Sequence, residues 1–204
     1  MRKVRIIASN IFDFQASRFN IGGVQTYLLD LANLLTDEGF KVELFQPHDE
    51  NTSFEYKGIN IWGVKLKSSI FRSINQMLFR RVKSKSGAND LIIISTDQMD
   101  IRSHDKNSIV IQHGIAFDYP KSNMSSALMQ YDISFTFIKL LRSLKNVVRF
   151  RNIKNTVCVD YNFFNWYRTI SEIPLTSKFK VIPNYASNSI SFHELESKLE
   201  KASR

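Results

Sequence analysis

The chain alternates between short continuous apolar runs and longer segments whose apolar residues recur every three or four positions. Residues 24–35 show the second pattern and predict an amphipathic helix. Gly39 suits the C-terminal cap of that helix, and residues 41–45 follow at once as a strand with Pro47 beyond it. Together with a first strand at residues 5–9, these elements predict one β-α-β unit.

The same alternation continues along most of the chain. Several of the apolar runs are continuously aliphatic, which is typical of strands covered on both faces. The pattern predicts an α/β fold, namely a Rossmann-like, doubly wound and mainly parallel sheet of about seven strands with helices on both faces. Further strands are expected at residues 59–64, 91–95, 109–112, 156–159 and 180–182, and further helices at residues 70–83, 126–148 and 162–171.

One domain accounts for most of the length. No internal repeat, low-complexity tract or Gly/Ser linker interrupts the first 186 residues, whereas residues 187–204 are polar and charged. We therefore expect a single domain at residues 1–186 and an interdomain linker or tail at residues 187–204.

Composition argues against several classes of protein. The hydrophobic content of 43% and the charged content of 23% are those of a globular domain rather than a disordered chain. The apolar runs have only a few residues, whereas a membrane-spanning helix needs about 20. Polar Ser9 and Asn10 end the first run too early for a signal peptide. The single cysteine, Cys158, lies between two valines as in a buried strand, and a lone cysteine fits a reducing cytoplasm.

The chain is basic, with 28 Lys and Arg against 19 Asp and Glu, a net charge of +9. Nucleic acid, an anionic membrane surface and a phosphorylated substrate would each account for this charge, and a merely soluble surface is the ordinary alternative. No helix-turn-helix, RNA-binding strand motif or zinc finger is visible, so nothing beyond the charge favours nucleic acid.

The strongest local signal is the pair Gly22-Gly23 directly before the first amphipathic helix. Glycines let the backbone approach a ligand closely, and the N–H groups at a helix N-terminus favour a phosphate or carboxylate, although such a pair also makes plain turns. No G-x-G fingerprint and no P-loop occurs, and the lone cysteine and four scattered histidines show no metal-ligand spacing. We therefore expect no cofactor and no metal ion.

Three motifs, in order along the chain, resemble one family of enzymes. Gly22-Gly23-Val24-Gln25 looks like the pattern G-G-[VA]-[EQ], His113-Gly114 follows a strand as H-[DG] does, and Pro183-Asn184-Tyr185-Ala186 precedes Phe192. The first 190 residues or so thus resemble the N-terminal, acceptor-side domain of a bacterial family 4 glycosyltransferase of the GT-B fold. No two glutamates are separated by seven residues, as they are in the family's donor-binding domain, so that second domain is expected to be absent.

The resemblance implies roles for individual residues. His113 would contact the transferred sugar or the acceptor hydroxyl as the catalytic-site residue, acting by polar positioning rather than as a nucleophile; a histidine that merely caps a loop is the alternative. Asp160 would orient the acceptor, but capping of the helix after it is the interpretation we favour. The donor diphosphate would contact Gly22, Gly23 and Val24, and the acceptor would contact Gln25 and Asp160. Phe14 and Arg18 are expected at the acceptor for another reason: their loop at residues 10–20 is long for a β-α connection, as loops that cover a binding site often are.

A basic series lies in the expected helix at residues 126–148 and just after it. Its members alternate with leucines and other apolar residues, so the helix could rest on anionic lipid, or it could simply present a solvated basic face. The series contains Lys139, Arg142, Lys145, Arg149 and Arg151.

The expected function follows from the resemblance. It is retaining transfer of a sugar from a nucleotide-sugar donor to a glycan or lipid-linked acceptor, in the synthesis of a bacterial surface polysaccharide. The location would be cytoplasmic, with peripheral contact to the inner face of the membrane, and the isolated domain would be inactive. Alternatives are a relative with a soluble acceptor and a non-catalytic protein that binds a glycan or a partner. The sequence specifies neither the sugar, the nucleotide and the linkage nor the oligomeric state.

Overall fold

The fold is built on one eight-stranded sheet. The computed structural model describes residues 2–15, 18–20, 22–67, 74–95, 107–113, 155–171 and 179–183, with five helical positions between 137 and 147. The helices are α1 (Gly23–Asp37), α2 (Ile74–Ser84) and α5 (Tyr161–Ser171). The strands of the sheet are β1 (Lys3–Ile7), β4 (Lys41–His48), β5 (Thr52–Tyr56), β6 (Ile59–Lys65), β7 (Leu91–Ile94), β8 (Ser108–Gln112), β9 (Thr156–Cys158) and β10 (Phe179–Val181).

The strand order is β10-β9-β8-β7-β1-β4-β6-β5, and every neighbouring pair is parallel except β5 with β6. The chain leaves β1 toward β4 on one side and later returns to β7 on the other. The order therefore reverses between β1 and β7, which makes the carboxyl edge of these strands the expected place for a ligand. The predicted Rossmann-like, mainly parallel α/β fold is confirmed.

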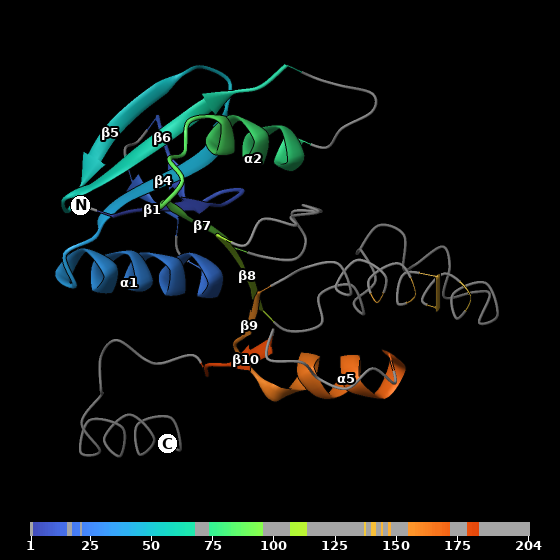
Figure 1. The fold of residues 1–204 in the computed structure, drawn as a ribbon. Helices are drawn as coiled ribbons and strands as arrows, with labels where there is room; N and C mark the ends of the chain where they lie inside the picture. Colours follow the sequence, from blue (N-terminus) through green and yellow to red (C-terminus); the bar gives the residue numbers. More distant parts are fainter. Residues whose placement is uncertain are drawn as a thin grey trace, which may run out of the picture.

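Helices cover both faces of the sheet (Figure 1). On one face, Val4 and Ile6 of β1 pack with Leu28 of α1. On the other face, Ile7 packs with Leu78 of α2 and Phe163 of α5. Neighbouring strand residues point to opposite faces, so a continuous aliphatic run such as residues 91–94 supplies both cores at once.

Helix α1 ends as the sequence predicts. Gly39 has φ +83°, a left-handed conformation that a side chain disfavours, and nothing else in the described structure crowds it. The turn satisfies the last carbonyl groups of the helix, because Glu38 N donates to Leu34 O at 3.0 Å and Phe40 N donates to Leu35 O at 3.0 Å.

Two strands differ from their predictions. Strand β4 continues through Pro47 to His48, whereas Pro47 was expected to lie beyond its end. The strand tolerates proline there because β1 pairs with β4 only as far as Phe45, so the missing N–H of Pro47 faces no strand on that side. Strand β5 was not predicted at all. It pairs antiparallel with β6 through the tight turn at Lys57 (φ 50°) and Gly58 (φ 79°), and it makes eight strands of the expected seven.

A second, two-stranded sheet lies in the loop after β1. It pairs β2 (Phe12–Asp13) antiparallel with β3 (Arg18–Phe19). Phe12 is buried at 2% exposure and its ring meets those of Phe19, Phe54 and Tyr56 with centroids 5.0 to 5.6 Å apart. The loop at residues 10–20 is therefore anchored on the core by aromatic packing.

One charged cluster lies inside the domain. Arg5 of β1 is paired in register with Glu43 of β4, and its Nε atom lies 3.0 Å from Glu43 Oε2. Its Nη1 atom lies 2.8 Å from Oδ2 of Asp90, which precedes β7. The three side chains are only 7%, 11% and 14% exposed, so the cluster has little solvent to screen it.

Some predicted elements lie outside the described residues. Of the helix expected at residues 126–148, only Phe137, Leu140, Leu141, Leu144 and Val147 are described, and these are helical. The domain end at residue 186 and the segment at residues 187–204 are not described. Within the described part, no helix is both long and apolar enough to cross a membrane.

Candidate functional site

The candidate site is at the carboxyl edge of the sheet, where four parallel strands end. The loop after β1 leads into α1, Ser95 follows β7, His113 follows β8, and Asp160 follows β9. Because parallel strands end at the same edge, polar groups far apart in the sequence come to lie together there.

The start of α1 is open to an anion. Gly22 is the N-cap in an extended conformation, no side chain caps the helix, and no acidic residue lies in its first turn. Thr26 N donates to Gly22 O at 2.8 Å, which leaves the N–H groups of Gly23, Val24 and Gln25 without an acceptor among the described residues. These groups and the helix dipole make a partial positive charge at this end.

Gly22 and Gly23 differ in how much room their surroundings leave for a side chain. A Cβ on Gly22 would clash with Oε1 of Gln25 and lie 3.1 Å from its Cδ, and Gln25 is held because its Nε2 donates to Asn10 O at 3.1 Å. A Cβ on Gly23 would meet nothing within 4 Å. Local packing thus explains Gly22, whereas no described residue occupies the space over Gly23.

His113 is a neutral imidazole that faces α1. Burial lowers its pKa from 6.5 to about 4, and this effect exceeds the opposing ones of nearby Asp160 and of a hydrogen bond to the Ser95 backbone. Ser95 N already donates to Ile7 O at 2.9 Å, so the bond from the ring goes to the Ser95 carbonyl. The Nε2 atom is buried without a hydrogen-bond partner among the described residues. Hence Nδ1 carries the proton, and Nε2 is left as an acceptor.

Tyr27 joins His113 to the start of α1. The two rings pack edge to face with centroids 5.0 Å apart, although 86 residues separate them in the sequence. Tyr27 lies one turn into α1, so its contact brings His113 close to the start of the helix, where the N–H groups are open. From the sequence, Tyr27 is only one of the apolar positions of the first helix, and no local signal marks it as a site residue.

Asp160 caps α5, which is the interpretation that we favoured. Its Oδ1 accepts hydrogen bonds from Asn162 N at 2.9 Å and from Phe163 N at 3.3 Å. Its charge also raises the pKa of the Cys158 thiol, which burial raises first, to about 12. Cys158 is fully buried in β9, as predicted, and its thiol stays protonated at neutral pH.

A polar cavity of about 390 Å³ opens beside the ends of β1 and β4. It is lined by the loop after β1, including Asn10, Asp13 and Phe14, and by the end of β4, including His48. The Phe14 ring lies against the His48 ring with centroids 4.6 Å apart. A cavity of this size and polarity suits a sugar, whose hydroxyl groups need hydrogen-bond partners.

Buried Gln46 shapes this cavity. Its Oε1 accepts from Ile11 N at 3.0 Å and from Phe12 N at 2.9 Å, and its Nε2 donates to Phe12 O at 2.8 Å. One side chain therefore satisfies the backbone of the loop much as a neighbouring strand would. The only signal in the sequence is a polar residue inside an apolar strand, which does not by itself mark a site residue.

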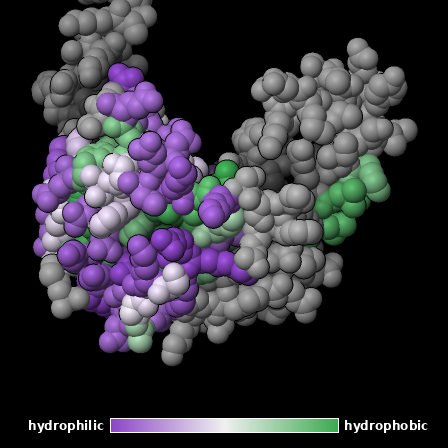
Figure 2. Space-filling model, turned by 90° about the horizontal axis from the view of Figure 1, so that it is seen from above, coloured by the Kyte–Doolittle hydropathy of each residue, from purple (hydrophilic) through white to green (hydrophobic). Residues whose placement is uncertain are grey.

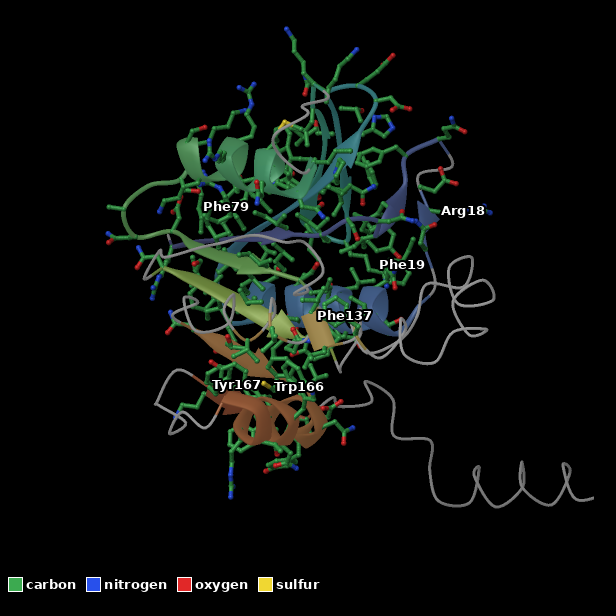
Figure 3. All side chains as sticks on the ribbon, turned by 90° about the vertical axis from the view of Figure 1, so that its right-hand side faces the viewer. Arg18, Phe19, Phe79, Phe137, Trp166 and Tyr167 are labelled. Atoms are coloured by element: carbon green, nitrogen blue, oxygen red, sulfur yellow. The ribbon has the colours of Figure 1, made fainter. Side chains whose placement is uncertain are left out.

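The structure does not bring all the predicted acceptor residues together. Phe14 lines the cavity, whereas Gln25 does not line it and only donates a hydrogen bond to the carbonyl of Asn10, which does. Arg18 points outward from the hairpin (Figure 3), with its Nε 3.5 Å from Oδ2 of Asp13 and its side chain 74% exposed. Asp160 lies on the His113 side. The predicted basic series, Lys139, Arg142, Lys145, Arg149 and Arg151, falls outside the described residues.

The lowered pKa of His113 makes stability depend on pH. The unfolded chain binds a proton at His113 near pH 6.5, but the folded protein binds it only near pH 4. Unfolding therefore takes up a proton between these values, and stability falls as the pH drops through this window. We expect His113→Phe, which keeps a ring against Tyr27, to reduce this loss. Partial exposure of the ring limits the difference to about 1 kcal/mol at pH 5, or about 2–4 °C in Tm.

Thermal melts of both proteins between pH 7.5 and pH 5 measure this effect. The two melting temperatures should differ by an amount that changes with pH. Parallel curves across the range would show that His113 has the same pKa in the folded protein as in the unfolded chain.

The fold is similar to one half of known glycosyltransferases. Sucrose-phosphate synthase from Thermosynechococcus elongatus superposes with a TM-score of 0.56 over 90% of this chain, at 13% identity. WaaG, a glycosyltransferase involved in lipopolysaccharide biosynthesis, superposes with a TM-score of 0.50 over 98%, at 10% identity. The chain spans 48% and 51% of these two structures, about half of each.

Comparison of sequences does not detect this similarity to glycosyltransferases. No family model matches it, and no curated protein matches it significantly. The likeness of the structures thus establishes the fold: this chain is a Rossmann-like α/β domain that corresponds to half of a GT-B glycosyltransferase fold.

Proposed function

We propose that this chain is the acceptor-side domain of a family 4 glycosyltransferase. It would transfer a sugar, with retention of configuration, from a nucleotide-sugar donor to a glycan or lipid-linked acceptor of a bacterial surface polysaccharide. One observation carries the proposal: Tyr27, one turn into α1 from its open N-terminus, packs against His113, whose buried Nε2 has no hydrogen-bond partner among the described residues. One group suits a diphosphate and the other a sugar hydroxyl.

Each group would have a distinct task in the transfer. The N–H groups of Gly23 and Val24 would stabilise the negative charge that grows on the leaving diphosphate. Neutral His113 would accept a hydrogen bond from a hydroxyl of the transferred sugar or of the acceptor and so hold it in place. The cavity beside Phe14 and His48 would hold the acceptor sugar. The donor phosphate itself would assist removal of the acceptor proton.

A donor-binding domain is the missing part of this proposal. The chain spans only about half of the two glycosyltransferases that it resembles. We propose that residues 187–204 link it to a second domain that holds the nucleotide. The cavity at the end of β4 and the start of α1 would then face that domain across a cleft.

Calorimetric titration with UDP- and GDP-sugars tests the proposal. This chain would be compared with a version extended through the following domain, if the gene encodes one. We expect the extended protein alone to bind and turn over a donor. Tight binding by the short chain, with no turnover by any longer form, would instead support a protein that binds a glycan or a partner without catalysis.

Membrane contact is a separate part of the proposal. Phe137, Leu140, Leu141 and Leu144 recur at helical spacing and are 58%, 53%, 50% and 48% exposed. Figure 2 shows them as an apolar patch at one side of the molecule. Half-exposed apolar residues on one helix face, in a segment rich in Lys and Arg, suit the interface of an anionic bilayer.

Vesicle flotation measures this contact. We expect the protein to float with vesicles that contain anionic lipid and to remain in solution with purely zwitterionic ones. A variant with Leu140→Ser and Leu144→Ser should lose at least half of the floated fraction, because each exposed leucine contributes apolar area to the interface. Equal flotation of variant and parent would contradict insertion by this face.

A further inference from the structure

A second cavity lies on the opposite face of the sheet, near its outer edge. Its volume is about 310 Å³, and β4, β5, β6 and the C-terminal end of α2 form its walls. Figure 1 shows that β5 and part of β6 extend beyond α2 and are not covered by it. Figure 2 views this side, where hydrophilic residues dominate and apolar ones appear between them.

The cavity is separate from the candidate acceptor cavity. Trp62 and Gly63 follow one another in β6, so their Cβ directions point to opposite faces. A Cβ on Gly63 would lie 3.0 Å from Phe14 Cζ and 3.0 Å from His48 Cβ, both of which line the acceptor cavity. Trp62 therefore faces the other way, into the second cavity.

Trp62 offers a fixed aromatic surface. It is 39% exposed, although a buried position would stabilise the protein more. Its ring is parallel to that of Phe45, its register partner on β4, with an interplanar angle of 11° and centroids 6.2 Å apart. Because Phe45 is buried, one face of the Trp62 indole packs beside a fixed ring. A sugar ring has faces made of C–H groups, and such a face packs well on an exposed indole.

Polar groups surround this surface. Ser53 is the register partner of Trp62 on β5 and so lies on the same face. Asn51 Oδ1 accepts a hydrogen bond from Lys65 N at 3.1 Å, which leaves the side-chain N–H groups as donors. Both residues line the cavity beside the indole and suit the hydroxyl groups of a sugar.

Two cations complete the lining. Arg81 and Lys85 are four residues apart and line the same cavity, and both residues are exposed. No salt bridge involves either of them within the described part of the chain. A guanidinium group and an ammonium group beside one another recognise a phosphate dianion.

We infer that this cavity binds a phosphorylated sugar, with the sugar ring on Trp62 and the phosphate between Arg81 and Lys85. The inference rests on this chain's own residues and does not depend on the proposed function. The ligand would bind away from the candidate site at the carboxyl edge of the sheet, so any effect on the protein would pass through β5, β6 and α2.

Titration with three hexose 6-phosphates tests the inference: those of glucose, mannose and N-acetylglucosamine. Free hexoses and inorganic phosphate form the comparison arms, and tryptophan fluorescence and calorimetry report binding. We expect at least one hexose phosphate to bind more tightly than its free sugar and than phosphate. Trp62→Ala and Arg81→Gln should each weaken that binding roughly tenfold, which corresponds to the loss of one strong contact.

Arg80→Gln is the matched control. Arg80 is exposed on α2, carries the same charge and does not line the cavity, so its removal should leave affinity unchanged. An equal loss in Arg80→Gln and Arg81→Gln would reduce the effect to net charge and overturn the inference. Absence of binding by all three hexose phosphates, or equal affinity for inorganic phosphate alone, would overturn it too. Arg81→Gln changes an exposed helix position, so this arm stays informative even if Trp62→Ala folds poorly.

Discussion

Replacement of Arg5 by leucine is expected to lower the free energy of unfolding by about 3–5 kcal/mol. Arg5 lies on a central strand, and its side chain is 7% exposed between the carboxylates of Glu43 and Asp90. The variant leaves two negative charges in a site with little water, and leucine cannot neutralise either of them. Urea denaturation at pH 7 measures the difference.

Lys3→Ala is the matched control for this experiment. Lys3 lies on the same strand and approaches the same carboxylate, with Nζ 3.9 Å from Glu43 Oε1, but its side chain is 38% exposed. Solvent screens such a pair, so the loss should stay below about 1 kcal/mol. Comparable losses in the two variants would show that burial does not set the strength of the cluster.

The double variant Arg5→Leu/Glu43→Leu separates charge from packing. It removes one of the two carboxylates that lose their partner in Arg5→Leu, and it puts two apolar side chains in register on neighbouring strands. We expect it to be more stable than Arg5→Leu alone, because a buried ion pair is often matched by apolar residues of similar size. Asp90 is kept, since its Oδ2 also accepts a hydrogen bond from Gly87 N at 2.8 Å.

The sequence predicted the elements whose signals are local and strong. The first helix was visible from its apolar spacing and from Gly39, and the central strands from their aliphatic runs. Strand β5 was missed because its burial alternates only between half-buried and exposed residues, and because Lys57-Gly58 is a weak turn signal. The length of β4 depends on its pairing with β6, which no local pattern encodes.

The candidate site was only partly predictable for the same reason. The open start of α1 is a property of neighbouring residues and could be read from Gly22-Gly23. The contact of Tyr27 with His113 depends on the order of the strands, since it joins residues on either side of the switch in that order. The three hydrogen bonds of Gln46 to the loop likewise form only when β4 and that loop lie side by side.

Under the proposed function, Gly23→Asp is expected to make the domain more stable and to slow sugar transfer strongly in the extended protein. A Cβ at this position meets no described atom within 4 Å, and the residue begins α1, where a carboxylate stabilises the helix dipole by about 0.3–1 kcal/mol. The same carboxylate would occupy the place of the donor diphosphate in our proposal. The rate of transfer should fall at least about 100-fold, the size of effect seen when a charge-stabilising group is lost.

Gly23→Asn separates charge from size in this test. Asparagine has nearly the shape of aspartate and also suits a helix start, but it does not repel a phosphate. We expect its transfer rate to stay within about tenfold of the parent, since only the charge repulsion is missing. Equal losses in the two variants would mean that the space over Gly23, and not its positive potential, matters for the donor. Full activity in Gly23→Asp would place the diphosphate away from α1. A gain in stability together with a loss of transfer would show that glycine at residue 23 serves the ligand and not the fold.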